Sequence, residues 1–235
     1  MTAAGTRWLI ALGGCLRAPE ALRRRLRREA PFERILAADA GLVHLDTLGL
    51  EPDILLGDFD SLAPERLAAA GSARILRFPS AKDESDGEIA LRLACEAGAR
   101  DMLIIGSCDF TRPDHFLANL DLLAAAKQED ARRRLELTDG RSRFLPLLGP
   151  ESATLCHPQR DPLLPGIPVV SLLPLSPQLE GVSYRGLVWS LEAATLRRGP
   201  SRTLSNRPAD AGGEFCVTVK SGLALLVLTR EDTIS

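Results

Sequence analysis

The stretch Ile54-Leu55-Leu56-Gly57-Asp58-Phe59-Asp60-Ser61 decides the fold, because a short apolar run ends there in two aspartates. The run has the length and composition of a buried β-strand. In extended backbone after a strand, Asp58 and Asp60 point to the same side, so both carboxylates can reach one hard cation. The plainer interpretation is a polar turn, with Gly57 bending the chain and Asp60 or Ser61 capping a following helix.

The same pattern of an apolar run followed by acidic residues occurs four times between positions 35 and 119. The runs are 35–38 before Asp39, 54–56 before Asp58 and Asp60, 75–78 before Lys82-Asp83-Glu84-Ser85-Asp86, and 102–105 before Arg112-Pro113-Asp114-His115. Parallel strands gather their carboxyl ends along one edge of a sheet, where ligands bind in open α/β folds. So many carboxylates repel one another unless cations lie among them. The sequence therefore predicts an Mg²⁺-dependent site for a phosphorylated substrate.

Residues 1–145 alternate strand and helix patterns, which predicts a Rossmann-like α/β domain with a parallel sheet. Expected strands lie at 8–12, 35–38, 54–56, 75–78, 102–105 and 135–138, and expected helices at 20–28, 43–48, 65–70, 86–97 and 114–127. Eight prolines between positions 146 and 177 exclude long helices there, and apolar runs at 169–173, 182–184, 215–219 and 223–228 indicate strands. Residues 146–235 are expected to form a small antiparallel, β-sandwich-like domain.

Composition excludes several classes of protein. The formal net charge of -2 gives no indication of binding to nucleic acid or anionic membranes, and the arginine run at 23–28 is expected on a solvated helix face. Five cysteines, odd in number and without a CxxC pair, argue against a disulfide framework or zinc site and favour a reducing compartment. Because no apolar run approaches bilayer-spanning length and 8–12 is interpreted as a strand rather than a signal peptide, a cytoplasmic protein is expected.

The segment Lys82-Asp83-Glu84-Ser85-Asp86 adds a cation to the acidic set. The spacing from Asp83 to Asp86 suits one face of a helix's first turn, and Asp86 could cap that helix. Lys82, one of only three lysines, could counter phosphate charge as a compact ammonium. A solvated helix start with a local ion pair remains an equally plain interpretation.

Three further groups could bind a ligand. Arg112 could clamp a phosphate with its two-pronged guanidinium, and Asp114 could orient it or cap the next helix. His115 is not assigned general-base work. Trp189 could offer its flat face to a cationic heteroaromatic ligand, although a tryptophan in such a segment is more often core or interface. Ser205-Asn206 by itself is typical of a turn.

In this order and spacing, these residues resemble the thiamine pyrophosphokinase (thiamine diphosphokinase) family. The likeness runs from about Ala37 to Asn206 and includes, besides the motifs above, Asp39-Ala40-Gly41, Asn119, the run 171–176 and Gly186-Leu187-x-Trp189. The resemblance implies an α/β nucleotide-binding domain, a β-sandwich-like domain and a homodimer. It also implies transfer of a diphosphoryl group from ATP to thiamine, giving thiamine diphosphate and AMP.

The resemblance also implies roles for individual residues. Asp58, Asp60 and Asp86 would hold Mg²⁺ on the triphosphate with Asp83 nearby, while Lys82 and Arg112 would neutralise charge on the transferred group. Nucleotide contacts are expected from Asp39, Lys82, Arg112, Asp114 and His115. Thiamine contacts are expected from Asp39, Trp189, Ser205 and Asn206, with Trp189 stacking on the ligand at the dimer interface.

Three departures from the family pattern and three alternative functions follow. Phe110-Thr111 stands where the family has two glycines, which would allow close backbone approach to phosphate. Ser85 and Thr203 are milder changes that keep a hydroxyl. The alternatives are a diphosphokinase for another hydroxymethyl heterocycle such as a pterin, a non-catalytic thiamine- or nucleotide-binding homologue, and a glycosyltransferase that uses Asp58 and Asp60 but leaves the second domain unexplained.

Overall fold

The computed structural model describes residues 6–59, 71–109, 111–156, 163–164, 166–210 and 213–231. The chain divides into two compact units, residues 1–140 and 141–235. From the sequence, this division was expected between 145 and 146. In the part of the chain that the structure describes, no helix is both long and apolar enough to cross a membrane.

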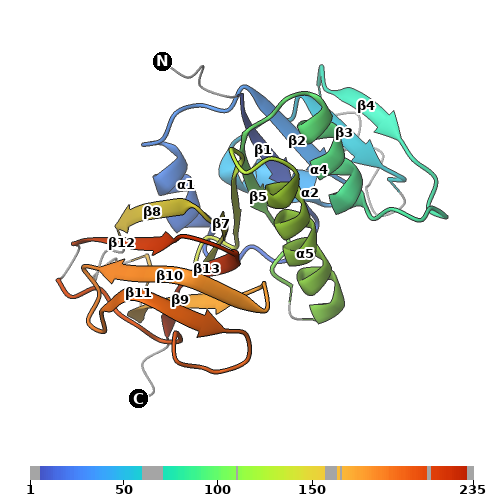
Figure 1. Cartoon of the computed structure of the whole chain (residues 1–235). Coiled ribbons are helices and arrows are strands. Elements are labelled where there is room, and N and C mark those ends of the chain that lie inside the picture. Colours follow the sequence, from blue (N-terminus) through green and yellow to red (C-terminus); the bar gives the residue numbers. More distant parts are fainter. Residues whose placement is uncertain are drawn as a thin grey trace. The chain divides into compact units, whose positions relative to one another are not determined.

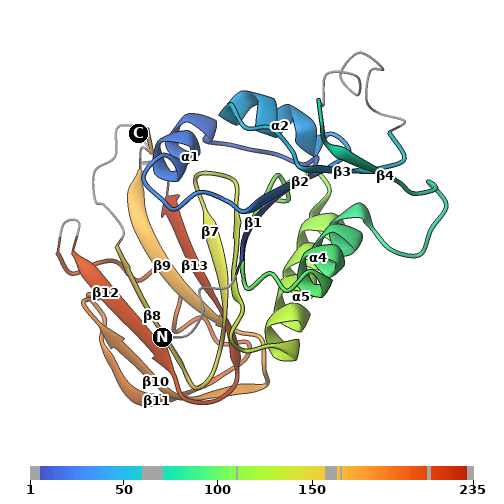
Figure 2. The same ribbon diagram turned by 90° about the horizontal axis from the view of Figure 1, so that it is seen from above.

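The first unit contains six strands that pair in parallel in the order β4-β3-β2-β1-β5-β6. Their bounds are β1 Arg7–Ala11, β2 Arg34–Ala38, β3 Ile54–Gly57, β4 Arg74–Arg77, β5 Asp101–Ile105 and β6 Arg134–Thr138. The helices are α1 Pro19–Leu26, α2 Gly41–Leu48, α4 Asp86–Glu96 and α5 Pro113–Glu129. Figure 2 shows α1 and α2 on one face of this sheet and α4 and α5 on the other. The parallel α/β prediction is confirmed, while the helix expected at 65–70 lies outside the described residues.

The four central strands, β1, β2, β3 and β5, contain continuous apolar runs because helices cover both faces of the sheet there. In β1 and β5, four successive residues are buried, and Leu9, Leu55 and Leu103 pack with α1 and α2 in one apolar cluster. The order of the strands reverses beside β1. From β1 the chain adds β2, β3 and β4 on one side, and then β5 and β6 on the other. Ligands bind outside the carboxyl ends of strands at such a reversal.

The start of α4 corrects one prediction. Asp86 was expected to cap this helix, but the cap is Ser85, whose Oγ accepts a hydrogen bond from the backbone N–H of Glu88 at 3.1 Å. A serine side chain is short enough to reach that N–H from the residue before the helix. Asp86 is therefore the first helical residue, where its carboxylate lies near the positive end of the helix without serving as its cap.

The second unit consists of two antiparallel sheets, ordered β7-β13-β9 and β11-β10-β12-β8. Their bounds are β7 Arg143–Leu148, β8 Glu151–Cys156, β9 Ile167–Pro174, β10 Gln178–Arg185, β11 Leu191–Arg197, β12 Glu214–Val219 and β13 Leu223–Glu231. The strands of the second sheet can be followed in Figure 1. Leu172 and Leu226 of the first sheet pack against Val182 and Phe215 of the second in one core, which confirms the predicted sandwich.

Candidate active site

A cavity of about 440 Å³ lies in the first unit at the carboxyl ends of β1, β2, β3 and β5. Its lining combines acids, cations, hydroxyl groups and glycines from five loops and the first turns of two helices. The lining residues are Leu12, Gly13, Gly14, Ala38, Asp39, Ala40, Asp58, Ser80, Lys82, Glu84, Ser85, Asp86, Gly87, Gly106, Ser107, Asp109, Arg112, His115 and Asn119. The cavity therefore occupies the sheet edge that the acidic pattern predicted.

The structure brings most of the predicted first-unit site residues to this cavity. Those that line it are Asp39, Asp58, Lys82, Asp86, Arg112, His115 and Asn119. Asp83 is exposed and Asp114 is largely exposed, and neither lines the cavity. Asp83 precedes the first turn of α4, so the helical spacing that paired it with Asp86 does not apply. Asp60 and Phe110 lie outside the described residues.

Asp39 is held at the end of β2 by an unusual local backbone. Its own φ is 43° and that of Phe59 is 64°, both in the left-handed region that non-glycine residues rarely adopt. The Oδ1 atom of Asp39 accepts a hydrogen bond from the backbone N–H of Phe59 at 3.2 Å. Gly57, at φ 145°, leaves room for this carboxylate, because a Cβ there would overlap Asp39 Oδ1. Strain of this kind is typical of functional sites.

The carboxylates of the cavity interact strongly. Burial and, to a smaller extent, the nearby charges of Asp86 and Asp58 raise the pKa of Asp39 to about 6, against the hydrogen bond from Phe59, which lowers it. Crowded carboxyl groups of this kind hold a proton unless a cation replaces it.

Lys82 supplies a positive charge within this group. Its Nζ lies 3.1 Å from Asp86 Oδ1 and donates to the carbonyl of Pro79 at 3.2 Å. The Lys82 side chain is only 15% exposed, so its charge is poorly screened by water. A single ammonium among Asp39, Asp58 and Asp86 leaves the group negative overall.

The donor set fits Mg²⁺ only if phosphate and water complete the coordination. Within the described ranges, no three acidic, imidazole or thiol groups are placed to hold a metal ion by themselves. Mg²⁺ prefers oxygen ligands and is commonly held by one or two carboxylates together with substrate phosphates. Asp58 and Asp86, both lining the cavity, are carboxylates of this kind.

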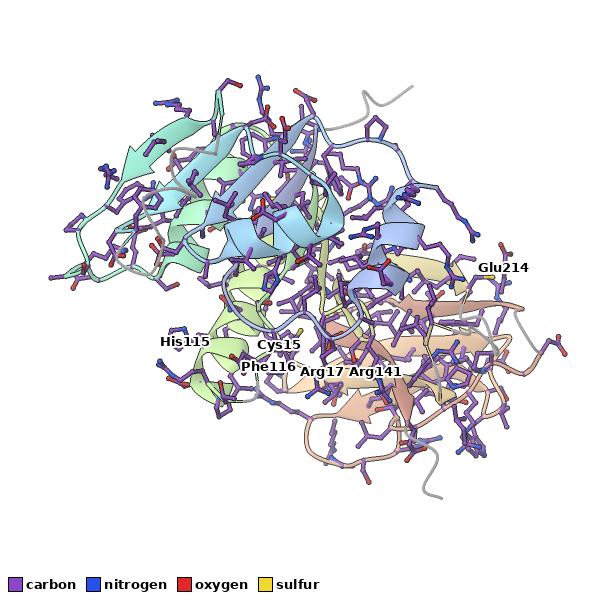
Figure 3. All side chains as sticks on the ribbon, turned by 180° about the vertical axis from the view of Figure 1, so that it is seen from behind. Cys15, Arg17, His115, Phe116, Arg141 and Glu214 are labelled. Atoms are coloured by element: carbon purple, nitrogen blue, oxygen red, sulfur yellow. The ribbon has the colours of Figure 1, made fainter. Side chains whose placement is uncertain are left out.

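Arg112 and Asp114 form a pair at the start of α5. Arg112 donates through Nε and Nη2 to the two oxygens of Asp114 at 3.1 and 2.8 Å. The hydrogen bonds from Arg112 lower the pKa of the Asp114 carboxyl to about 2. The side chains are 60% and 65% exposed, so water screens the pair well and another anion can replace Asp114 as the partner of Arg112. The next two residues diverge, with His115 exposed and Phe116 buried (Figure 3).

Sequence reasoning missed several residues of this cavity. Asp109 Oδ1 accepts hydrogen bonds from the backbone N–H and hydroxyl of Thr111 at 2.8 and 2.7 Å. The Asp-x-Thr spacing of this turn was the signal that could have found it. Glu84 also lines the cavity but is engaged by Arg92 at 2.9 Å. Ser107 had no signal in the sequence, because its position depends on loops that meet only in the folded chain.

The residues predicted to contact thiamine lie in the second unit. Trp189 is 58% exposed, whereas Asn206 is buried. Asn206 Oδ1 accepts from the backbone N–H of Trp189 at 3.1 Å, and Asn206 Nδ2 donates to the Trp189 carbonyl at 2.8 Å. Ser205 is exposed at φ 60°, and its backbone N–H donates to Ser171 Oγ at 3.0 Å. Within this unit, Asn206 therefore fixes the backbone that carries the Trp189 ring.

The first unit has the parallel fold and the acid-and-lysine cavity of an α/β transferase. Residues 29–135 match the family model described as thiamin pyrophosphokinase, catalytic domain. This part of the chain is therefore similar to that catalytic domain, and the protein is an enzyme of the transferase class. The resemblance inferred from the sequence is confirmed.

The fold is shared with solved thiamin pyrophosphokinases. The Bacillus subtilis protein is 21% identical over 96% of this chain and 100% of its own, with a TM-score of 0.79. The Geobacillus thermodenitrificans protein is 24% identical over 98% of this chain and 100% of its own, with a TM-score of 0.76. The Candida albicans protein is 15% identical over 95% of this chain and 89% of its own, with a TM-score of 0.73. These likenesses establish the fold; no curated protein matches the sequence.

Proposed function

We propose that the protein transfers a diphosphoryl group from ATP to the hydroxyethyl oxygen of thiamine, giving thiamine diphosphate and AMP. The observation that carries the proposal is the crowding of Asp39, Asp58 and Asp86 around Lys82 in the cavity beside the strand reversal. Such a group suits a ligand that brings its own divalent cation, as nucleoside triphosphates do. The match of residues 29–135 to the thiamin pyrophosphokinase catalytic domain supports the identity of the substrates.

In the proposed reaction, the thiamine oxygen attacks the β-phosphorus of ATP. The bond from that phosphorus to the α–β bridging oxygen breaks, AMP leaves, and the hydroxyl proton passes to a carboxylate of the cavity. Asp58 and Asp86, with Asp60 as predicted from the sequence, would hold Mg²⁺. When bound, Mg²⁺ neutralises phosphate charge. Asp83 and Asp114 retain only the supporting roles that the sequence suggested.

Two basic side chains would stabilise the charge on the transferred group. Lys82 is held in the cavity by Asp86 and presents a compact ammonium. Arg112 lines the cavity, and its guanidinium would exchange the exposed carboxylate of Asp114 for phosphate oxygens. This transfer requires positioning and charge neutralisation more than covalent catalysis, and these two groups would supply that neutralisation together with the bound Mg²⁺.

For the second unit, we propose binding of thiamine and dimerisation. The exposed indole of Trp189 on a fixed backbone suits stacking against a flat, positively charged heterocycle. Asn206, in the segment between β11 and β12, bonds to the Trp189 backbone, and Ser205 is its neighbour in the chain. The homodimer and the cytoplasmic location stay predictions from the sequence.

The test is an assay of the purified protein with ATP, Mg²⁺ and thiamine, in which AMP and thiamine diphosphate are separated by chromatography. We expect AMP to form only when thiamine and Mg²⁺ are both present. Asp58→Asn should lower kcat by a factor on the order of 10² to 10³, the usual effect of removing one charge-stabilising group. Asp121→Asn, which changes an exposed carboxylate of α5 outside the cavity, is the matched control.

Three other outcomes would contradict the proposal. Release of ADP would exclude diphosphoryl transfer. AMP formation with a hydroxymethylpterin but not with thiamine would favour the pterin alternative. Thiamine binding without any turnover would favour a non-catalytic homologue.

A further inference from the structure

Two loops meet where the order of the strands reverses between β1 and β5. The backbone N–H of Gly14, after β1, donates to the carbonyl of Gly106, after β5, at 2.6 Å. Both glycines are required by this approach. A Cβ on Gly14 would lie 2.5 Å from the Gly106 oxygen, and a Cβ on Gly106, at φ 71°, would overlap the carbonyl of Leu12. The two turns therefore form one interlocked wall of the cavity.

His44 of α2 holds this wall from behind. Its Nε2 lies 2.6 Å from the carbonyl oxygen of Gly14. Because a carbonyl can only accept, Nε2 carries the hydrogen. The imidazole also packs against Gly106, where a Cβ would lie 2.8 Å from His44 Cδ2. Both the neutral Nε2–H tautomer and the imidazolium donate to Gly14, so the contact does not depend on pH.

The residue that this wall presents to the cavity is Ser107. Its side chain is 4% exposed and lines the cavity, and its Oγ has no nitrogen or oxygen partner among the described residues. The thiol of Cys108 beside it is buried and is at best a weak partner. A buried hydroxyl without a good partner destabilises a protein, and such groups call for an explanation.

We propose that the Ser107 hydroxyl donates a hydrogen bond to a phosphate oxygen of the bound nucleotide, and that His44 positions the wall that presents it. This inference rests on the proposed function. A phosphate oxygen only accepts, which matches an unsatisfied hydroxyl donor. Lys82 and Arg112 line the same cavity, and glycine turns let a phosphate come close to the backbone. Ser107 would thus bind phosphate through an uncharged hydroxyl, at a position separate from the carboxylates that would hold Mg²⁺.

The test uses Ser107→Ala in the full-length protein, with two measurements expected to move in opposite directions. Without ligand, the melting temperature should rise, because the variant loses a buried unsatisfied hydroxyl. The affinity for MgATP, measured by calorimetry, should fall by a factor on the order of ten, the usual effect of losing a hydrogen bond to a charged group. Ser107→Cys, with a weaker donor of similar shape, should fall between the two proteins in affinity.

His44 is tested by rescue. His44→Ala should weaken MgATP binding while lowering the melting temperature, because the Gly14 carbonyl loses its donor. His44→Gln should recover part of the affinity, since a carboxamide also donates. Thr47→Ala removes an exposed side chain from the same helix, whose hydroxyl bonds only to Val43 among the described contacts, and should leave the affinity unchanged.

The results separate this inference from the proposed function. Unchanged MgATP affinity in Ser107→Ala would overturn it, and so would a lower melting temperature, which would show a structural serine. A wild-type protein that binds magnesium tripolyphosphate but not MgATP would refute the proposed nucleotide substrate. The Ser107 subsite would then stand only if Ser107→Ala weakens tripolyphosphate binding by the same factor. A wild-type protein that binds neither would overturn both proposals.

Discussion

The buried side-chain amide of Asn206 makes two hydrogen bonds to the backbone of Trp189: it accepts from the N–H at 3.1 Å and donates to the carbonyl at 2.8 Å. The indole that this backbone carries is 58% exposed. Ordering a flexible segment during binding opposes affinity, so a ring whose backbone is already fixed binds a flat ligand at a smaller entropic cost. The arrangement is what a stacking platform requires.

Asn206→Ala should destabilise the protein and weaken thiamine binding together. It removes both hydrogen bonds to Trp189 and the one from the backbone N–H of Arg207, and it leaves part-buried backbone groups unsatisfied. The free energy of unfolding should therefore fall by about 1–3 kcal/mol. Urea denaturation measures the first effect and calorimetry with thiamine the second. Ser201→Ala is the control, because Ser201 is exposed and its described bond, from the N–H of Leu204, is to its backbone carbonyl and survives. Equal losses in the two variants would contradict the role of Asn206.

Gly57→Ala should displace the carboxylate of Asp39. The new Cβ would overlap Asp39 Oδ1, and φ 145° is itself unfavourable for alanine. We expect loss of thiamine-dependent AMP formation and a decrease in unfolding free energy well above about 1–2 kcal/mol. Gly71→Ala is the matched control. Gly71 also has a left-handed φ of 61°, but a Cβ there would meet nothing within 4 Å. Gly71→Ala should therefore show only the cost of an unfavourable φ for alanine, without a steric clash. Normal activity in Gly57→Ala would show that the position of Asp39 is unimportant.

The sequence predicted the parallel sheet well and the antiparallel sandwich only in part. Strands buried on both faces, such as β1 and β5, are continuous apolar runs. All six strands of the first unit were recognised, including the more polar β4 and β6. The sequence did not indicate β7, β8 or β11. In β8, half-buried and exposed residues alternate without strong apolar character, and β7 contains Pro146, which argues against a strand.

The sequence predicted those residues of the site that follow the ends of strands, but not those that reach the site through contacts between loops. Asp39, Asp58 and Asp86 follow or adjoin strands and helix starts, so their order along the chain was enough to bring them together. Ser107 and His44 became part of the site through the contact between two glycine turns, which no local pattern encodes.

Because of Asp39, the free energy of unfolding of the ligand-free protein should decrease as the pH is raised from about 4 to about 6. Burial, reinforced by Asp86 and Asp58, raises the pKa of Asp39 to about 6, above its ordinary value of about 3.9 in an unfolded chain. In this window the native state binds the proton more tightly than the unfolded state. The stabilisation is therefore full below about pH 4 and is lost as the pH rises through 6.

Asp39→Asn isolates this effect, since asparagine still accepts from Phe59 and tolerates a left-handed φ. The melting temperature of the variant minus that of the wild type, measured in EDTA, should increase from pH 4.5 to pH 7. Added Mg²⁺ should reduce that difference at pH 7, because the cation replaces the proton. A difference independent of pH would contradict the crowding of Asp39 by its neighbours.

Replacing Lys82 separates its catalytic role from its structural one. Lys82→Met keeps the length of the side chain but removes the charge, so kcat for AMP formation should fall by a factor on the order of 10² to 10³. Lys82→Arg should restore only part of this, because a planar guanidinium does not reproduce a compact ammonium 3.1 Å from Asp86. Lys220→Met, at an exposed position of the second unit, should change neither kcat nor the melting temperature appreciably. If Lys82→Met lowered the melting temperature and left kcat intact, the lysine would serve only to balance the charge of Asp86. The charge of the transferred group would then have to be neutralised by Arg112 and the bound cation.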